Sequence, residues 1–146
     1  GAAIVLDPAQ DSPHDHWRAH GVLATLAEVA VASAPGRQPV IFECVGAPGL
    51  IQAQIDRAPP GARIVVVGVC MASDSFEPAV AINKQLSIEF AFGYSADEFA
   101  QTLRLLGDGA MPANALLSGE VALDGVAEMF ARLSSEPSLI KVIVRP

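Results

Sequence analysis

A chain of 146 residues is long enough to form one domain with a sizeable hydrophobic core. Its net charge of −7 predicts that it binds no nucleic acid, because neutralising phosphates requires clustered Lys and Arg. No apolar run approaches the ~20 residues that span a bilayer, no signal peptide opens the chain, and two cysteines make no disulfide framework, so we expect a cytoplasmic protein without a membrane partner.

The first part of the chain predicts one short strand and one helix. Residues 4–6 are apolar and read as a buried strand. Ser12 and Asp15 have the spacing of a capping box, which predicts a helix over residues 13–34 with one apolar face. Gly21 is a candidate break within this helix.

The middle of the chain alternates strands with helices. The predicted strands are residues 40–45, 63–69 and 86–92, and the predicted helices are residues 50–57, a turn ending at Gln85, and a helix opened by a capping box at Ser95. The strands are nearly continuously apolar, as in parallel sheets that are covered on both faces. The high hydrophobic content, 51%, also fits a surface that further sequence normally covers.

The last part of the chain predicts two more strands around one helix. Residues 117–123 and 139–144 read as strands, and Asp124 is a candidate cap for the helix between them. Strands that alternate with helices along the whole chain predict an α/β fold with a mainly parallel sheet and flanking helices.

One expected motif is absent from this α/β pattern. A Rossmann unit grips a pyrophosphate through a G-x-G-x-x-G turn between its first strand and first helix. The chain contains no such turn, and residues 1–4 stand roughly where a third strand would start. We therefore expect a partial Rossmann-like domain that lacks the first two strands and the glycine-rich turn, and hence a fragment of a larger protein.

Five stretches occur in an order and spacing that resemble a known family. They are residues 1–8, 42–46 (FECVG), 61–69 (GARIVVVGV), 90–93 (FAFG) and 140–142 (IKV). Taken together they are similar to the C-terminal half of the medium-chain dehydrogenase/reductase family, the zinc-type alcohol dehydrogenases. The resemblance implies an oxidoreductase that uses NAD or NADP and acts on a small alcohol or carbonyl substrate.

The resemblance also implies where the cofactor would lie. In such a sheet the ligand binds at the carboxyl ends of the strands. The implied cofactor-binding residues are Cys44, Val45, Gly46, Val67, Gly68, Val69, Phe90, Ala91, Phe92 and Lys141. Val45 and Gly46 would approach the cofactor ribose, and Lys141 would lie near the pyrophosphate. The backbones of residues 67–69 and 91–92 would contact the nicotinamide carboxamide. Val69 and Ala91 would also lie where the substrate pocket of the family begins.

Each of these residues also has a structural interpretation. The valines would be core residues in any parallel sheet, and Gly46 and Gly68 would permit a turn or close packing. Lys141 would be a solvated charge on a strand. No catalytic residue is predicted in this chain.

The family resemblance implies a zinc ion whose ligands precede this chain, so no metal ligand is predicted here. We expect Cys44 and Cys70 to behave as small buried hydrophobes. His16 and His20 would share one face of a helix and could reach one metal, with His14 or Asp15 as a third ligand. The favoured interpretation of these histidines is a polar first turn of a surface helix.

The family resemblance and the expected strand order predict how the chain is divided into domains and how it associates. The family resemblance divides the chain into a partial nucleotide-binding domain, residues 1–110, and a segment, residues 111–146, that returns to the missing N-terminal catalytic domain. With the usual strand order, residues 4–6 would lack neighbouring strands. We therefore expect that they either pair beside residues 40–45, or else pair with another chain or are disordered. The apolar edge strand 86–92 predicts a homodimer through residues 79–92.

Three functions compete at this point. The first is the cofactor-domain fragment of an NAD(P)-dependent dehydrogenase, which is inactive alone and binds NAD weakly or undetectably. The second is a non-catalytic α/β dimerisation or interaction module. The third is a methyltransferase-like nucleoside binder, which ranks last because such domains carry a glycine-rich loop after their first strand.

Overall fold

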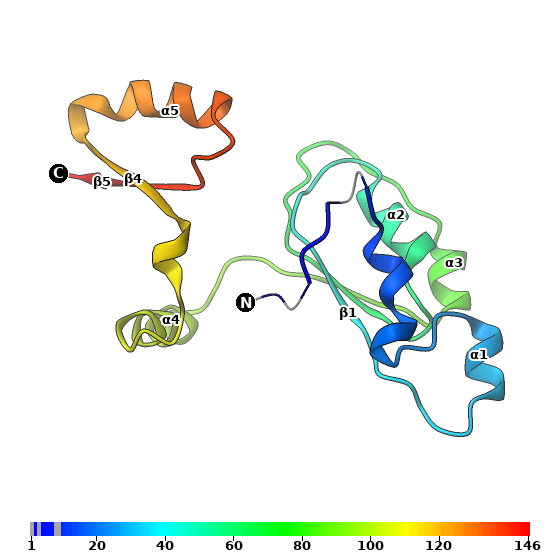
Figure 1. The fold of residues 1–146 in the computed structure, drawn as a ribbon. Helices are drawn as coiled ribbons and strands as arrows, with labels where there is room; N and C mark the ends of the chain where they lie inside the picture. Colours follow the sequence, from blue (N-terminus) through cyan, green and yellow to red (C-terminus); the bar gives the residue numbers. More distant parts are fainter. Residues whose placement is uncertain (1, 3, 8–9) are drawn as a thin grey trace. The chain divides into compact units, whose positions relative to one another are not determined.

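A computed structural model describes residues 2, 4–7 and 10–146 of the chain. Gly1 and Pro8, which belong to the first of the five family stretches, lie outside the described residues. The chain divides into two compact units, Gly1–Phe92 and Gly93–Pro146 (Figure 1). This division rests on compactness, and the predicted family boundary at residue 110 stays a prediction.

The first unit contains a three-stranded parallel sheet. Its strands are β1 (Val40–Glu43), β2 (Arg63–Val66) and β3 (Ser87–Phe90), paired in the order β1-β2-β3. Helix α2 (Leu50–Arg57) connects the first two strands and helix α3 (Pro78–Asn83) connects the last two. Right-handed crossovers in one direction place both helices on the same face of the sheet. The predicted parallel, Rossmann-like α/β fold is thereby confirmed.

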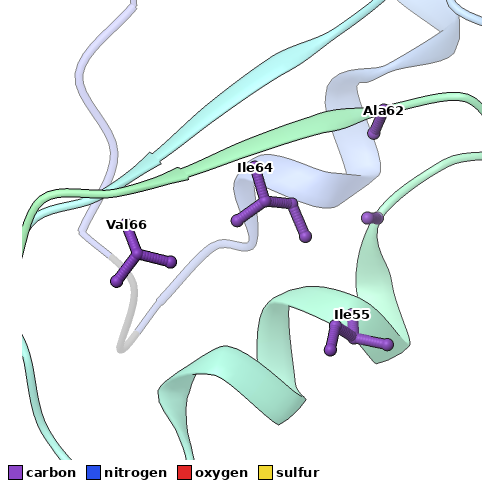
Figure 2. Packing of buried hydrophobic residues seen from close by; sticks show 5 residues of the cluster. Ile55, Ala62, Ile64 and Val66 are labelled. Carbon is purple, nitrogen blue, oxygen red and sulfur yellow. The ribbon is translucent and has the colours of Figure 1, made fainter. Parts of the chain in front are cut away.

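The core of this unit lies between β2 and α2. Ile64 and Val66 on the strand point toward Ile55 on the helix, as Figure 2 shows. Ile55 and Ile64 are 0% exposed, and Ala58 and Ala62 complete the buried cluster. The alternate residues of β2 are less buried, so the apolar strand is covered on one face more fully than on the other.

The end of α2 is held by a side chain from the following crossover. The Nζ of Lys84 donates hydrogen bonds to the carbonyl oxygens of Ile55 (3.0 Å), Asp56 (2.6 Å) and Ala58 (3.1 Å). The last carbonyls of a helix have no partner within the helix, and a cation there also complements the helix dipole. Lys84 therefore joins α2 to the chain segment that precedes β3.

The first part of the chain differs from the prediction in two ways. Residues 4–6 form no strand, and Val5 is 87% exposed rather than buried. The sheet order of the described residues begins at β1, so the first of the two alternatives, pairing of residues 4–6 beside residues 40–45, is wrong. A three-residue strand with no ladder partner gains too few hydrogen bonds to offset the entropy of ordering it.

The single helix predicted over residues 13–34 is also wrong. It is replaced by two 3₁₀ helices, η1 (Pro13–His16) and η2 (Arg18–His20), and by the short α1 (Leu26–Val31). Gly21 takes a left-handed φ of 77° and breaks the segment, as its position suggested. The Ser12 side chain accepts a hydrogen bond from the His14 nitrogen instead of forming a capping box. The capping box lies at Thr25 and Glu28.

The second unit is built around a two-stranded parallel sheet. Its elements are α4 (Ala96–Gly107), η3 (Ala113–Leu116), β4 (Leu117–Ala122), η4 (Leu123–Gly125), α5 (Val126–Ser135) and β5 (Lys141–Arg145). The capping box at Ser95 is confirmed. Asp124 lies in η4, and Gly125 occupies the position that precedes α5, so the expected Asp124 cap is wrong. No described helix is long and apolar enough to cross a membrane.

Candidate functional site

The carboxyl ends of β1 and β2 touch backbone to backbone. Gly46 has a φ of 71°, and a Cβ on it would lie 2.5 Å from the Val69 nitrogen. A Cβ on Gly68 would in turn collide with the Gly46 backbone. The chain tolerates no side chain at either position without moving one loop away from the other. Close packing is therefore one function of both glycines, as the structural interpretation of the sequence proposed.

A buried carboxylate organises the same junction. Glu43 ends β1 and is 5% exposed. Its Oε1 accepts hydrogen bonds from the backbone nitrogens of Val45 (2.7 Å) and Gly46 (2.9 Å). Its carbonyl oxygen accepts hydrogen bonds from the nitrogens of Val67 (2.8 Å) and Gly68 (2.9 Å). These four amide groups are thus satisfied inside the protein, and a ligand at this junction receives no N–H from them.

An apolar cleft opens at the carboxyl ends of β2 and β3. It has a volume of about 440 Å³. Val66 and Phe90, which pair across the sheet, form its floor together with Ile51, and Phe76 and Phe92 add aromatic surface. Half of the ten predicted cofactor residues line it, namely Gly68, Val69, Phe90, Ala91 and Phe92. Clefts of this size and character, at this edge of a parallel sheet, are typical small-molecule sites.

One wall of the cleft is a loop that is tied to the start of α2. The carboxylate of Asp74 accepts hydrogen bonds from the nitrogens of Gly49 (3.0 Å) and Ser75 (2.8 Å). The Oε1 of Gln52 accepts a hydrogen bond from the nitrogen of Glu77 (2.6 Å). Sequence reasoning did not single out these residues, because polar residues in a loop carry no signal of the distant amides that they meet.

The other predicted cofactor residues lie elsewhere. Cys44, Val45, Gly46 and Val67 lie at the β1–β2 junction beside the cleft rather than on its lining. Lys141 begins β5 in the second unit and is exposed. Glu43 belongs to the family stretch 42–46 but is not among the predicted site residues. The signal that could have identified it is a single charged residue near the end of an apolar strand.

The expectation of two buried cysteines is wrong. Cys44 is exposed and Cys70 is half-buried. Side chains alternate between the faces of a strand. Since Glu43 and Ile41 lie on the face that α2 and α3 cover, Cys44 and the exposed Phe42 lie on the opposite face.

The histidines do not form a metal site. Among the described residues no group of three or more His, Cys, Asp or Glu side chains could hold a metal ion. His16 pairs with Asp11 at 3.0 Å, and a turn between η1 and η2 separates it from His20. The ring of His14 packs edge-on against Trp17, with 5.9 Å between centroids. Burial lowers the pKa of His14, and the nearby Arg57 lowers it further.

The comparisons with known proteins agree with one another. The sequence model of a family described as zinc-binding dehydrogenase matches residues 1–108. The curated (R,R)-butanediol dehydrogenase of Bacillus subtilis (strain 168) is 27% identical over 145 residues, which are 99% of this chain and 38% of that protein. The chain therefore spans less than half the length of this relative.

Two solved structures share the fold over nearly the whole chain. L-idonate 5-dehydrogenase of Escherichia coli K-12 superposes with a TM-score of 0.74 at 24% identity, covering 99% of this chain and 38% of that one. A Sinorhizobium meliloti 1021 protein solved bound to NADP superposes with a TM-score of 0.74 at 21% identity, covering 100% of this chain and 40% of that one. At these identities the superpositions establish the fold alone.

Proposed function

Because the chain belongs to the zinc-binding dehydrogenase family, we propose that it forms part of the nicotinamide-cofactor site of an NAD(P)-dependent dehydrogenase of small alcohols or polyols. The observation that carries the proposal is the apolar cleft at the carboxyl ends of β2 and β3, which five of the ten implied cofactor residues line. The butanediol dehydrogenase and the NADP-bound relative support the substrate class and the cofactor class.

The residues of the cleft fit a nicotinamide ring in size and polarity. The ring is flat and needs apolar walls, which Val69, Phe90 and Phe92 would supply. The backbone of residues 67–69 and 90–92 would supply polar atoms for the carboxamide, apart from the Val67, Gly68 and Ala91 amides, which already donate to carbonyl oxygens of the sheet. The cofactor, when bound, would accept or donate the hydride. The part of this chain is to bind and orient the ring and to exclude water from one of its faces.

The remaining implied contacts complete the proposal. The Val45-Gly46 backbone would run beside the ribose, as the family resemblance implies. Gly46 serves this arrangement through the contact between the two loops, because the Gly68-Val69 backbone occupies the place that a Cβ on Gly46 would need. Lys141 would oppose the pyrophosphate charge. The donor set of this chain does not fit a catalytic zinc ion, since the described residues hold no cluster of three ligands, and we assign no step to a metal here.

We extend the proposal to the assembly. The 146-residue chain is inactive alone, because it contains no glycine-rich pyrophosphate turn and no nucleophile or proton relay that the sequence identifies. It would be completed by an N-terminal catalytic domain and would form a homodimer through residues 79–92. The support for the dimer is that β3 is an edge of the three-stranded sheet, so one side of this strand has no strand partner among the described residues.

The test is a titration of the isotopically labelled chain with NADH and with NADPH, monitored by the amide shifts of residues 43–46, 66–70 and 90–92. We expect shifts in the fast-exchange regime, with a dissociation constant weaker than about 10 μM. Ala91→Trp should fill the cleft and abolish the shifts, while Ala100→Trp, an equal change on the exposed surface of α4, should leave them intact.

The outcomes separate the two leading functions. Shifts confined to the cleft support the dehydrogenase fragment, and their loss in the Ala91 variant locates the ring. No shift at millimolar cofactor would overturn the proposal in favour of a non-catalytic dimerisation module. Self-association in sedimentation does not separate the two functions, because both include the homodimer. Catalytic turnover by the chain alone would contradict the proposed inactivity.

A further inference from the structure

The Glu43 side chain lies in the last row of the sheet, beside the cleft. In the strand register Glu43 pairs with Val66, and Val66 pairs with Phe90. The latter two line the cleft, so the carboxylate lies on the same face of the sheet as the cleft floor. At 5% exposed it is the buried charged residue of the core region.

A carboxylate in such a place is costly unless hydrogen bonds replace its water. The Val45 and Gly46 amides do so through one oxygen, at 2.7 and 2.9 Å. Bonds from backbone amides to an ionised carboxylate are stronger than those between neutral groups. The Glu43 side chain therefore holds Val45 and Gly46, in the loop after β1, close to the end of that strand.

The same residue fixes the loop after β2 through its backbone. The Glu43 carbonyl oxygen accepts both the Val67 and Gly68 amides, so one residue holds two successive amides on each of the two loops. The pair of glycines, Gly46 and Gly68, can touch only while both loops keep these positions. If the first loop shifted, the backbone contact and the edge of the cleft at Gly68 and Val69 would shift with it.

We propose that Glu43 is a positioning residue of the cofactor site: its carboxylate locks the Val45-Gly46 loop against the Gly68-Val69 loop and so shapes the edge where the ring and ribose bind. This inference rests on the proposed function. The hydrogen bonds of Glu43 go to backbone amides of the two loops, so in this proposal it acts on the cofactor through the backbone that it holds.

Glu28 provides a matched control in the same unit. Its carboxylate likewise accepts two successive backbone amides, those of Ala24 (2.6 Å) and Thr25 (3.1 Å), but it caps α1 and lines no part of the cleft. Glu28→Ala removes the same kind of interaction, together with an ion pair to Arg18 (2.6 Å), without touching the β1–β2 junction. An effect seen in both the Glu43→Ala and the Glu28→Ala variants therefore reports a general loss of stability. An effect seen only in Glu43→Ala reports a change in the loops at the β1–β2 junction.

The first measurement is amide hydrogen exchange, resolved by residue, in the full chain. Glu43→Ala should accelerate exchange at Val45 and Gly46 by about 10- to 100-fold relative to Ile64, because each loses a bond to a charged group. Glu43→Gln keeps an acceptor oxygen and should restore part of the protection. Glu43→Asp keeps the charge but is shorter by one methylene, and should resemble the alanine variant. Unchanged exchange in all three variants would overturn the proposal.

The second measurement is the dissociation constant for NADH and NADPH from the amide shifts. It should weaken about tenfold, equivalent to ~1.4 kcal/mol, in Glu43→Ala, less in Glu43→Gln, and not at all in Glu28→Ala. Equal weakening in the Glu43 and Glu28 alanine variants would overturn the positioning role. If the unmodified chain shows no cofactor shift, the proposed function fails, while the exchange measurement still decides whether Glu43 locks the loop.

Discussion

The two units of the chain have the same alternation of strand and helix, but they differ in how completely their apolar side chains are buried. In the first unit, β2 has a strand on each side and a helix over one face, and Ile55 and Ile64 are completely buried. In the second unit both strands are edges, and neither α4 nor α5 contains a buried residue. The same alternation of elements thus gives a fully buried core only in the unit that has a central strand.

We expect the largest difference between the two units when a core side chain is truncated. Ile64→Ala should lower the free energy of unfolding of the first unit by about 3 kcal/mol, because a fully buried site leaves a cavity. The same change at Ile143, on β5 in the second unit, should cost below ~1 kcal/mol because that side chain is 38% exposed. Urea denaturation monitored by residue-resolved exchange measures both, and equal losses would break the comparison.

Substitution of a glycine tests the backbone contact between Gly46 and Gly68 in the first unit. Gly68→Ala should cost about 2 kcal/mol, since its Cβ would strike the Gly46 backbone. Gly107→Ala, at the end of α4, meets no atom within 4 Å and should be neutral or stabilise by up to ~1 kcal/mol. Thermal unfolding by circular dichroism gives both values. A tolerated Gly68 variant would mean that the two loops separate easily.

The role of Lys84 as the cap of α2 can be tested against Lys141, a lysine of the second unit. Lys84→Met should destabilise the first unit by about 1–2 kcal/mol, because three carbonyl oxygens lose their donor. Lys141→Met, on the exposed start of β5, should change stability by less than ~0.5 kcal/mol. Denaturant midpoints of the two variants measure the difference, and a larger effect at Lys141 would contradict the capping role.

Mild acid should act on the first unit through His14. Burial and the nearby Arg57 lower the pKa of His14 below its usual 6.5, so the folded state binds its proton less readily than the unfolded state. The stabilising contribution is present above the unfolded pKa and is lost as the pH falls from about 6.5 through the lowered pKa. His14→Gln should flatten this region of the stability profile. An NMR titration that gives an ordinary pKa would refute the prediction.

Stronger acid should act on the second unit through the cap of α4. Hydrogen bonds from the Ser95 amide and hydroxyl lower the pKa of Glu98 below the usual glutamate range. Its small stabilising effect is present at neutral pH and is lost as the pH falls through that lowered pKa. Amide exchange in the first turn of α4 should therefore rise in acid, and Glu98→Gln should show the rise already at neutral pH. No difference between the variants at neutral pH would contradict the prediction.

The sequence predictions were correct where the signal lies in neighbouring residues and wrong where the element needs a distant partner. The bounds of α2 match the prediction, and the Ser95 box opens α4 as expected, because helix starts and stops depend on residues within one turn. Residues 4–6 had an equally clear apolar pattern but form no strand, because a strand needs a neighbour that no local pattern supplies. The candidate site divides in the same way: the strand-end positions were predictable, whereas the bonds of Glu43 and Asp74 were not.

The sequence by itself determined the α/β class, the order of most elements and the family, because apolar periodicity and short motifs are written in consecutive residues. Only the tertiary structure decided which strands pair, which glycines need to be glycines, and that Glu43 holds the two loops together. These features depend on atoms that meet across 20 or more positions of the chain, as Gly46 and Gly68 do. Close packing and hydrogen bonding at that separation arise from the whole fold and not from any segment of it.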